Sequence, residues 1–284
     1  MHTPSPASDD AAPPRVAASP HSRAAAEAPP ELLNVTRADR RLLRMPWTPL
    51  IRNKFHEFWI KARGKRIKGQ GLIGADSWSV ATGFESLSPR DFETYNLPQN
   101  WVERRTIPRA LNRRVPAHNA RVIDLGCGPG FSTRIIAHFA QPSWNILGFD
   151  FVAHYIAEAS RHAAAGTIRN RDNLIIRPTF RVQSITETLA TDSGPLEASS
   201  IDFAVAGGVV GLYLQPPDVA TLALELCRVI KPGGYAALDS GPAIPPHRLK
   251  HIMLDRGFAF VELIRSVAFD PRPKLVFMRL PHAT

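Results

Sequence analysis

The second half of the chain alternates between two patterns of hydrophobic positions. Short apolar runs rich in β-branched and aromatic residues end at glycine or aspartate, and stretches with apolar residues three or four positions apart follow them. The first pattern is typical of buried strands and the second of amphipathic helices. Their alternation predicts an α/β fold with a mostly parallel sheet and helices on both faces. The predicted strands cover 120–125, 145–149, 179–183, 200–206, 235–239, 258–263 and 274–280, and the last two helices cover 218–230 and 249–256.

A glycine-rich loop follows the first predicted strand. The sequence there reads Asp124-Leu125-Gly126-Cys127-Gly128-Pro129-Gly130, and a helical pattern begins at Phe131. Glycines permit positive φ angles and let a ligand lie against bare backbone, and the start of the helix offers unpaired N–H groups. A dinucleotide-binding loop needs a further glycine where Phe131 stands, and Asp124 favours a ligand with donors or a positive charge over a phosphate. The pattern predicts a polar ligand at this turn, with a turn that binds nothing as the alternative.

This loop resembles motif I of the class I S-adenosylmethionine-dependent methyltransferases. A second stretch, 226–234, ends in Lys231-Pro232-Gly233-Gly234 and resembles the motif at which a helix of that family ends before the fifth strand. The resemblance covers Ala120 to the end of the chain. It implies a Rossmann-like, seven-stranded, mostly parallel sheet, a methyltransferase domain over 119–284, and S-adenosyl-L-methionine as cofactor. The implied reaction is methyl transfer by in-line displacement.

The resemblance also implies which residues bind the cofactor. Asp150 closes the second strand 24 residues beyond Gly126, so one crossover places it beside the glycine loop, where an acid can accept both hydroxyls of a ribose. Asp150 can also act as a helix N-cap. Ser184 stands where the family commonly has an aspartate that accepts from the adenine amino group, and a serine hydroxyl accepts more weakly. The predicted cofactor-binding residues are Asp124, Gly126, Cys127, Gly128, Gly130, Asp150, Phe151, Ser184, Ile185, Ala206 and Gly207.

The loop after the fourth strand bears on the methyl acceptor. It reads Ala206-Gly207-Gly208-Val209-Val210 where the family places the floor of the substrate pocket. It has neither the polar residue, Pro-Pro and aromatic with which the nucleic-acid amino-methylating branch grips a base, nor a Pro-Cys nucleophile. A small organic or lipid-like acceptor is therefore the leading hypothesis. No catalytic residue is assigned, and the candidate bases are His56, Tyr95, His154 and Tyr213.

Charge and composition set the first part of the chain apart. Residues 1–121 contain 20 Lys and Arg against 11 Asp and Glu, with most of the excess between Asp39 and Lys68, and the whole chain has a net charge of +10. We expect a disordered Pro/Ala/Ser tail over 1–36. A basic, aromatic-containing extension or lid over 37–118 follows, with a helix over 51–63 and short helices over 86–114 broken by Pro89, Pro98 and Pro108.

The basic segment keeps two other functions open. It can bind phosphate-rich partners, so RNA methylation is the second hypothesis. A non-catalytic scaffold that keeps the fold without the cofactor is the third. Cys127 and Cys227 lack metal-ligand spacing and are expected to be free thiols, and no metal site is predicted. The sequence shows no secretory signal and no apolar run of the roughly 18 residues needed to span a membrane, so we expect a cytoplasmic protein.

Overall fold

A computed structural model of the chain describes residues 29–42, 83–267 and 272–281. Nearly all of these residues belong to one compact unit, Glu31–Thr284, and every element described below lies in it. The predicted helix over 51–63, His56 and the basic residues between 44 and 68 lie outside the described residues. So do residues 1–28 of the predicted tail.

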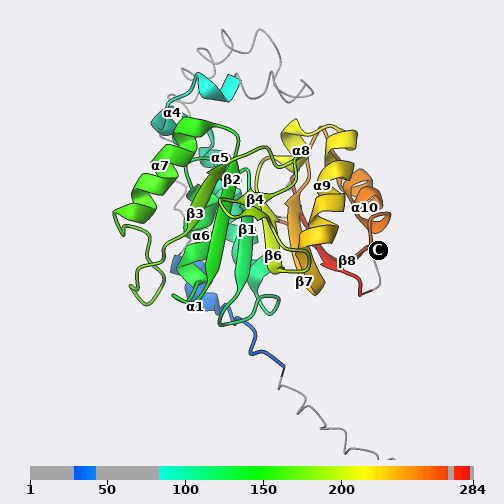
Figure 1. Cartoon of the computed structure of the whole chain (residues 1–284), viewed down its shortest axis with the longest axis horizontal. Helices are drawn as coiled ribbons and strands as arrows, with labels where there is room; N and C mark the ends of the chain where they lie inside the picture. Colours follow the sequence, from blue (N-terminus) through cyan, green and yellow to red (C-terminus); the bar gives the residue numbers. More distant parts are fainter. Residues whose placement is uncertain (1–28, 43–82, 268–271, 282–284) are drawn as a thin grey trace, which may run out of the picture. The chain divides into compact units, whose positions relative to one another are not determined.

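A seven-stranded sheet forms the centre of this unit, in the order β3-β2-β1-β6-β7-β9-β8 (Figure 1). Its first five strands in that order run parallel, and β9 pairs antiparallel with both β7 and β8. The predicted α/β fold with a seven-stranded, mostly parallel sheet is confirmed. The strands are β1 (Arg121–Leu125), β2 (Asn145–Asp150), β3 (Thr179–Val182), β6 (Ile201–Ala206), β7 (Ile230–Asp239), β8 (Phe258–Ile264) and β9 (Lys274–Arg279), and β4 (Ala190–Thr191) pairs with β5 (Gly194–Pro195) outside this sheet.

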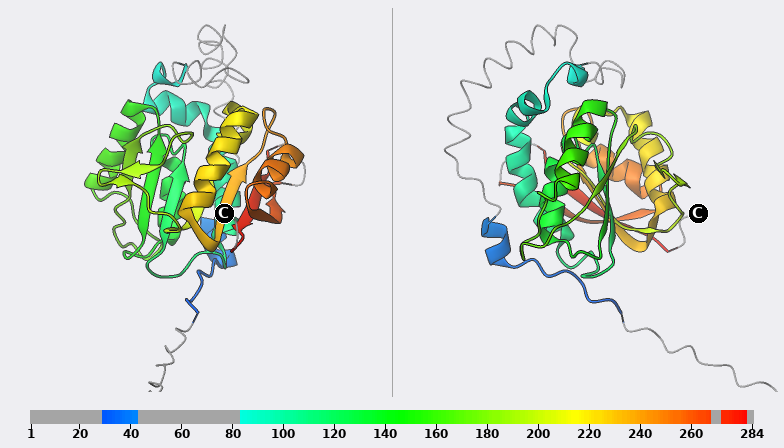
Figure 2. Two further views of the ribbon diagram at one scale, coloured as in Figure 1. Left: turned by 45° about the vertical axis from the view of Figure 1, so that its right-hand side comes forward. Right: turned by 60° about the vertical axis from the view of Figure 1, so that its left-hand side comes forward.

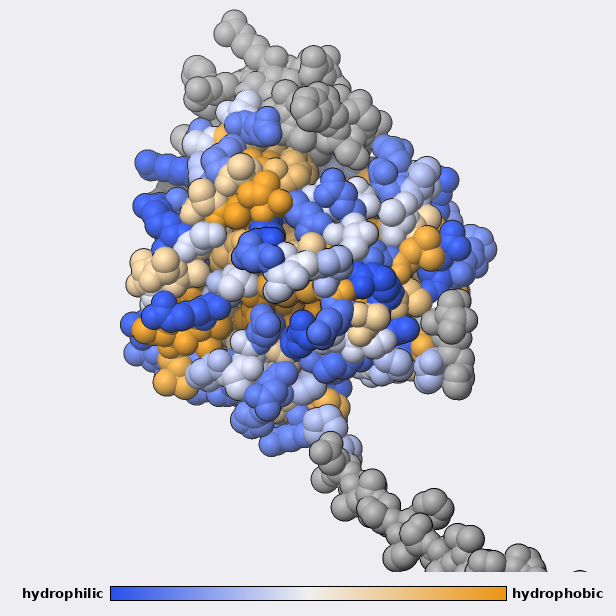
Figure 3. Space-filling view, in the orientation of Figure 1, coloured by the Kyte–Doolittle hydropathy of each residue, from blue (hydrophilic) through white to orange (hydrophobic). Residues whose placement is uncertain are grey.

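Helices cover both faces of the sheet (Figure 2). Side chains alternate along β1, so that Ile123 and Leu125 pack into one core cluster with α9 and α10, while Val122 packs into the other with α5 and α6. Figure 3 shows hydrophilic side chains over much of one face, between smaller hydrophobic groups. None of the described helices is long and apolar enough to cross a membrane. The helices are α1 (Arg37–Leu42), α4 (Pro89–Tyr95), α5 (Leu97–Leu111), α6 (Phe131–Phe139), α7 (Ala153–Ala164), α8 (Val210–Tyr213), α9 (Pro216–Val229) and α10 (Pro246–Leu254).

The prolines before the sheet act differently from one another. Pro89 and Pro98 lie in the first turns of α4 and α5, where a missing N–H costs little. The predicted break at Pro108 is wrong, because Pro108 lies inside α5. Ile107 and Leu111 on either side of it are fully buried, and this burial offsets the lost backbone hydrogen bond.

The end of the predicted tail is ordered. The backbone N–H of Leu33 donates to the carbonyl oxygen of Val115 at 2.8 Å, and that of Arg113 donates to the carbonyl of Leu33 at 2.8 Å. Leu33 and Val35 are each 3% exposed and belong to the core cluster under α5 and α6. The prediction of disorder up to residue 36 is therefore wrong at its end, because composition averaged over the tail hides these two apolar anchors.

Candidate functional site

A cavity lies at the sheet edge where β1, β2 and β6 end. The register pairs Leu125 with Phe149 on one side and with Ala206 on the other, so the loops that follow these three strands meet there. The cavity encloses about 790 Å³ of empty space when the open solvent at its mouth is included. Its walls are formed by Phe84, Phe92, Asn96, Gly126, Asp150, Phe151, Val152, Tyr155, Ser184, Ile185, Thr186, Gly207, Gly208, Val209, Tyr213 and Leu214.

The glycine loop presents bare backbone to this cavity. Gly126 has a φ of +68°, and its N–H donates to the carbonyl oxygen of Phe149 on β2 at 2.8 Å. A Cβ at Gly126 would lie 2.3 Å from Cγ2 of Val209, in the loop after β6. Only glycine can therefore combine this backbone conformation with so close an approach between the two loops.

Asp150 holds the carboxylate that faces the cavity. Its Oδ2 accepts from the N–H of Gly128 at 2.8 Å, and its Oδ1 accepts from the N–H of Val152 at 2.9 Å. Burial raises the pKa of Asp150 to about 6, against the lowering effect of these two donors. Each oxygen has a second lone pair, so the carboxylate can still accept from a ligand. The N-cap position of α7 belongs to Val152 and not to Asp150, although Asp150 accepts the N–H of that residue.

Asp124 lies behind the glycine loop, away from the cavity wall. Its Oδ2 accepts from the hydroxyls of Ser132 at 2.7 Å and Thr133 at 2.5 Å, in the first turn of α6. Burial raises its pKa to about 6 against the lowering effect of both hydroxyls. The structure does not bring Asp124 and Asp150 to one cavity wall: Asp124 joins the end of β1 to the start of α6.

The other predicted cofactor-binding residues divide into two groups. The cavity is lined by Gly126, Asp150, Phe151, Ser184, Ile185 and Gly207. Cys127, Gly128 and Gly130 of the glycine loop and Ala206, the last residue of β6, are not part of its lining. Cys127 is buried, and burial raises the pKa of its thiol, so its place is that of a packed side chain. The Ser184 hydroxyl is within 2.8 Å of the Thr186 hydroxyl, so it already has one partner.

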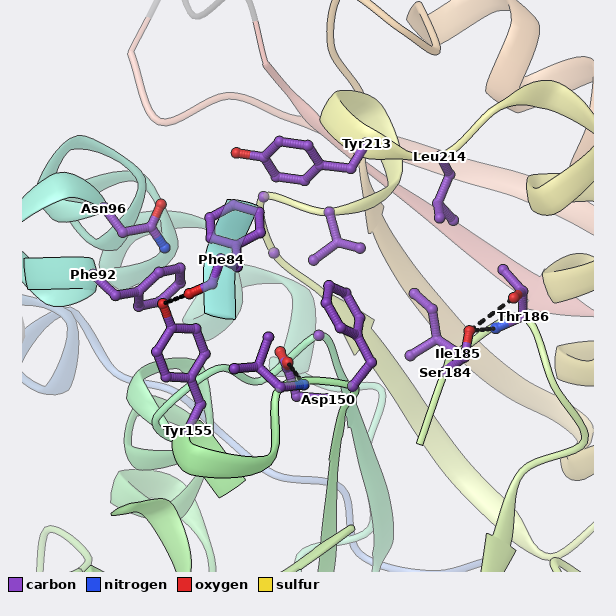
Figure 4. Close-up of a pocket in the computed structure, with 16 residues that line it drawn as sticks. Phe84, Phe92, Asn96, Asp150, Tyr155, Ser184, Ile185, Thr186, Tyr213 and Leu214 are labelled. Carbon is purple, nitrogen blue, oxygen red and sulfur yellow. Dashed lines mark hydrogen bonds between the residues drawn. The ribbon is translucent and has the colours of Figure 1, made fainter. Parts of the chain in front are cut away.

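Aromatic side chains from outside the sheet close one side of the cavity. Figure 4 shows Phe84, Phe92 and Tyr155 on one side, with Ser184 on the other. The Phe84 ring stands nearly perpendicular to that of Tyr213, with centroids 5.2 Å apart, and the Tyr155 hydroxyl donates to the Phe84 carbonyl at 2.9 Å. Sequence reasoning missed Phe84 and Phe92 as lining residues, because they precede the sheet in the chain and reach the cavity only through tertiary packing.

The candidate bases lie in different places. Tyr213 lines the cavity, and burial raises its pKa, so it stays a neutral phenol. Tyr95 contacts Tyr213 by a side-chain hydrogen bond and is not part of the lining. The Nε2–H of His154 donates to the carbonyl of Leu87 at 2.9 Å, outside the lining. Of these three residues, Tyr213 is the one that lines the cavity.

Known proteins resemble the part of the chain that contains this cavity. Residues 116–253 match a protein-family model described as a methyltransferase domain. A trans-aconitate 2-methyltransferase of Methylobacterium nodulans is 32% identical over 153 residues, which is 52% of this chain and 50% of that protein. A ubiquinone biosynthesis O-methyltransferase of Xylella fastidiosa is 25% identical over 44% of this chain and 43% of its own length.

The chain thus spans about half the length, or less, of the curated relatives it matches. Among solved structures, a TehB-like SAM-dependent methyltransferase from Corynebacterium glutamicum aligns with a TM-score of 0.44 and 16% identity. That alignment covers 57% of this chain and 81% of that one. The matched domain, the strand order and the glycine loop agree with the resemblance seen in the sequence. Residues 116–253 thus form a methyltransferase domain of the class I S-adenosylmethionine-dependent type.

Proposed function

We propose that this protein transfers a methyl group from S-adenosylmethionine to an oxygen atom of a small acceptor with an apolar, ring-bearing body. The observation that carries the proposal is the group of aromatic side chains over the cavity. Phe84, Phe92 and Tyr213 come from three separate segments and meet beside the carboxyl edge of the sheet. Aromatic rings offer a large apolar surface with few rotatable bonds, which suits a flat, apolar ligand.

The cavity residues fit the cofactor of this family. The spare lone pairs of Asp150 suit the two hydroxyls of a ribose, and the backbone of Gly126, which lines the cavity, can contact the amino-acid part. Ser184 and Ile185 would contact the adenine. Asp124 would act from behind, by holding Ser132 and Thr133 in the first turn of α6. Bound there, the cofactor supplies a methyl group that its sulfonium charge already activates.

The protein's contribution to the reaction is then mainly one of placement. Proximity and orientation can supply roughly 7–11 kcal/mol of a barrier without an acid or base. The Tyr213 phenol and the Asn96 amide both face the cavity and can hold the polar group of an acceptor. The aromatic side chains would exclude water from around the apolar ring of the acceptor.

The relatives suggest two kinds of acceptor. Trans-aconitate is a tricarboxylate, whereas the ubiquinone pathway methylates the oxygen of an apolar ring compound. The described residues that line the cavity include no lysine or arginine, and such cations would be needed to neutralise three carboxylates. This favours a phenol or enol over a polycarboxylate.

A labelling experiment tests the proposal. The protein is incubated with methyl-labelled cofactor and with cell extract separated into RNA, protein, lipid and small-metabolite fractions, alongside simple phenols and tricarboxylates. We expect label in the lipid or small-metabolite fraction and in the phenols. Label confined to RNA would overturn the proposal in favour of RNA methylation. Calorimetry with S-adenosylhomocysteine tests the third hypothesis, that of a non-catalytic scaffold. Such a scaffold does not bind the cofactor and would release no heat.

A further inference from the structure

A buried ion pair lies behind the loop that follows β6. The ammonium of Lys274, on β9, is 3.0 Å from Oε2 of Glu103, on α5, and the two side chains are 1% and 3% exposed. Lys274 also donates to the carbonyl oxygen of Ala206, the last residue of β6. The amide of Gln99 donates to the other oxygen of Glu103 at 2.6 Å. The pair thus ties α5 and β9 to the end of a central strand.

Only glycine backbone separates Glu103 from the cavity. A Cβ at Gly207 would lie 2.6 Å from the carboxyl carbon of Glu103, and a Cβ at Gly208 would lie 2.7 Å from Cγ of Gln99. Both glycines line the cavity. A charge on Glu103 is therefore separated from a bound ligand by one layer of backbone, in surroundings that screen it weakly.

The charges around Glu103 do not cancel. Asp124 and Asp239 are close enough to interact electrostatically with it. Asp239 accepts from three backbone N–H groups at the start of α8, the closest being that of Gly211 at 3.0 Å. These four side chains thus comprise three carboxylates and one ammonium, that of Lys274. When all are ionised, the group carries a net negative charge behind the cavity floor.

We propose that Glu103 is a positioning residue: by neutralising the Lys274 ammonium, it leaves the negative charge of Asp124 and Asp239 to make the site prefer the positively charged cofactor over its neutral product. The inference rests on the proposed function. When the methyl group forms a bond to the acceptor oxygen, the C–S bonding pair stays on sulfur, and the acceptor's proton passes to solvent. S-adenosylhomocysteine then carries no sulfonium charge, so the attraction to the net negative charge behind the cavity floor is lost and product release is favoured.

Two single substitutions should act in opposite directions. Calorimetry gives the affinities of each variant for S-adenosylmethionine and for S-adenosylhomocysteine without any acceptor. In Glu103→Gln, the uncompensated ammonium should lower the ratio of the affinity for S-adenosylmethionine to that for S-adenosylhomocysteine by at least about tenfold, which is the effect of one charge about 12 Å away at an effective dielectric constant near 20. In Lys274→Met, the uncompensated carboxylate should raise it by a similar factor. Glu103→Asp keeps the charge and should keep the ratio.

A double variant guards against loss of folding, because each single variant leaves a buried charge without its partner. Glu103→Gln with Lys274→Met removes both charges and should keep the ratio within threefold of the wild type. A tenfold change in the double variant, or single variants that weaken both ligands equally, would overturn this inference. A wild-type protein that binds neither ligand would instead contradict the proposed function.

Discussion

The backbone N–H of Gly128 donates a 2.8 Å hydrogen bond to Oδ2 of Asp150, and so joins the loop after β1 to the end of β2. The N–H of Val152 holds the other oxygen at 2.9 Å. The carboxylate is therefore fixed by two backbone donors that no side-chain rotation can remove. Its remaining lone pairs are held in a constant position at the cavity, which suits the proposed recognition of a ribose.

Asp150→Asn should weaken cofactor binding. The substitution removes the charge and places an amide donor where an acceptor is needed, and hydrogen bonds to charged groups contribute about 1.5–3 kcal/mol each. We expect the affinity for S-adenosylhomocysteine to fall by at least about tenfold in calorimetry. Asp255→Asn is the matched control, because Asp255 is exposed at the end of α10. An Asp150 variant that binds as tightly as this control would exclude the ribose role.

Binding should also depend on pH through the same residue. Burial raises the pKa of Asp150 to about 6, so its carboxylate becomes protonated below that pH and loses acceptor capacity. The affinity for S-adenosylhomocysteine should therefore rise about tenfold from pH 5 to pH 7, if only the ionised form binds. Calorimetry at four or five pH values measures this. The rise should disappear in Asp150→Asn, and its persistence there would assign it to Asp124 instead.

Local patterns were enough to predict that Gly126 and Asp150 lie together at one edge of the sheet. Gly126 follows the first strand, and Asp150 ends the second, which is joined to the first by one crossover. Residues close together in the sequence determine these elements, so the two positions could be predicted. The aromatic residues Phe84 and Phe92 could not be predicted as lining residues, because they meet the sheet edge only through tertiary packing. The same is true of Glu103 and Lys274, which come from segments before and after most of the sheet.

Gly126→Ala should cost both stability and binding. An alanine with φ near +68° is strained by about 1–2 kcal/mol, and its Cβ would also overlap Val209. Gly233→Ala is the matched control, since Gly233 has a φ of +80° but no atom within 4 Å of the position that a Cβ would take. Urea denaturation should show a loss in both variants and the larger loss in Gly126→Ala. Only Gly126→Ala should weaken S-adenosylhomocysteine binding. If Gly233→Ala weakened it equally, the close packing between the loops after β1 and β6 would not be what supports binding.

Tyr155→Phe should affect the acceptor more than the cofactor. It removes the 2.9 Å hydrogen bond to the carbonyl of Phe84 and so loosens the segment that carries that ring. We expect a loss of about 1 kcal/mol in the free energy of unfolding. The KM for the acceptor should rise while the affinity for S-adenosylhomocysteine stays unchanged. Tyr235→Phe, outside the cavity lining, is the control. If Tyr155→Phe weakened acceptor binding and S-adenosylhomocysteine binding equally, Phe84 would not belong to the part of the cavity that binds the acceptor.

The basic residues before the sheet should be dispensable for turnover of a small acceptor. Arg63, Lys65, Arg66 and Lys68 can all be replaced by glutamine, which removes four positive charges without adding any negative ones. If the aromatic part of the cavity receives the acceptor, this variant should methylate a phenol at the wild-type rate. RNA binding measured at 50 and 200 mM salt should weaken, because fewer counterions are released on binding. Loss of phenol turnover with intact cofactor binding would instead place the basic segment at the acceptor site.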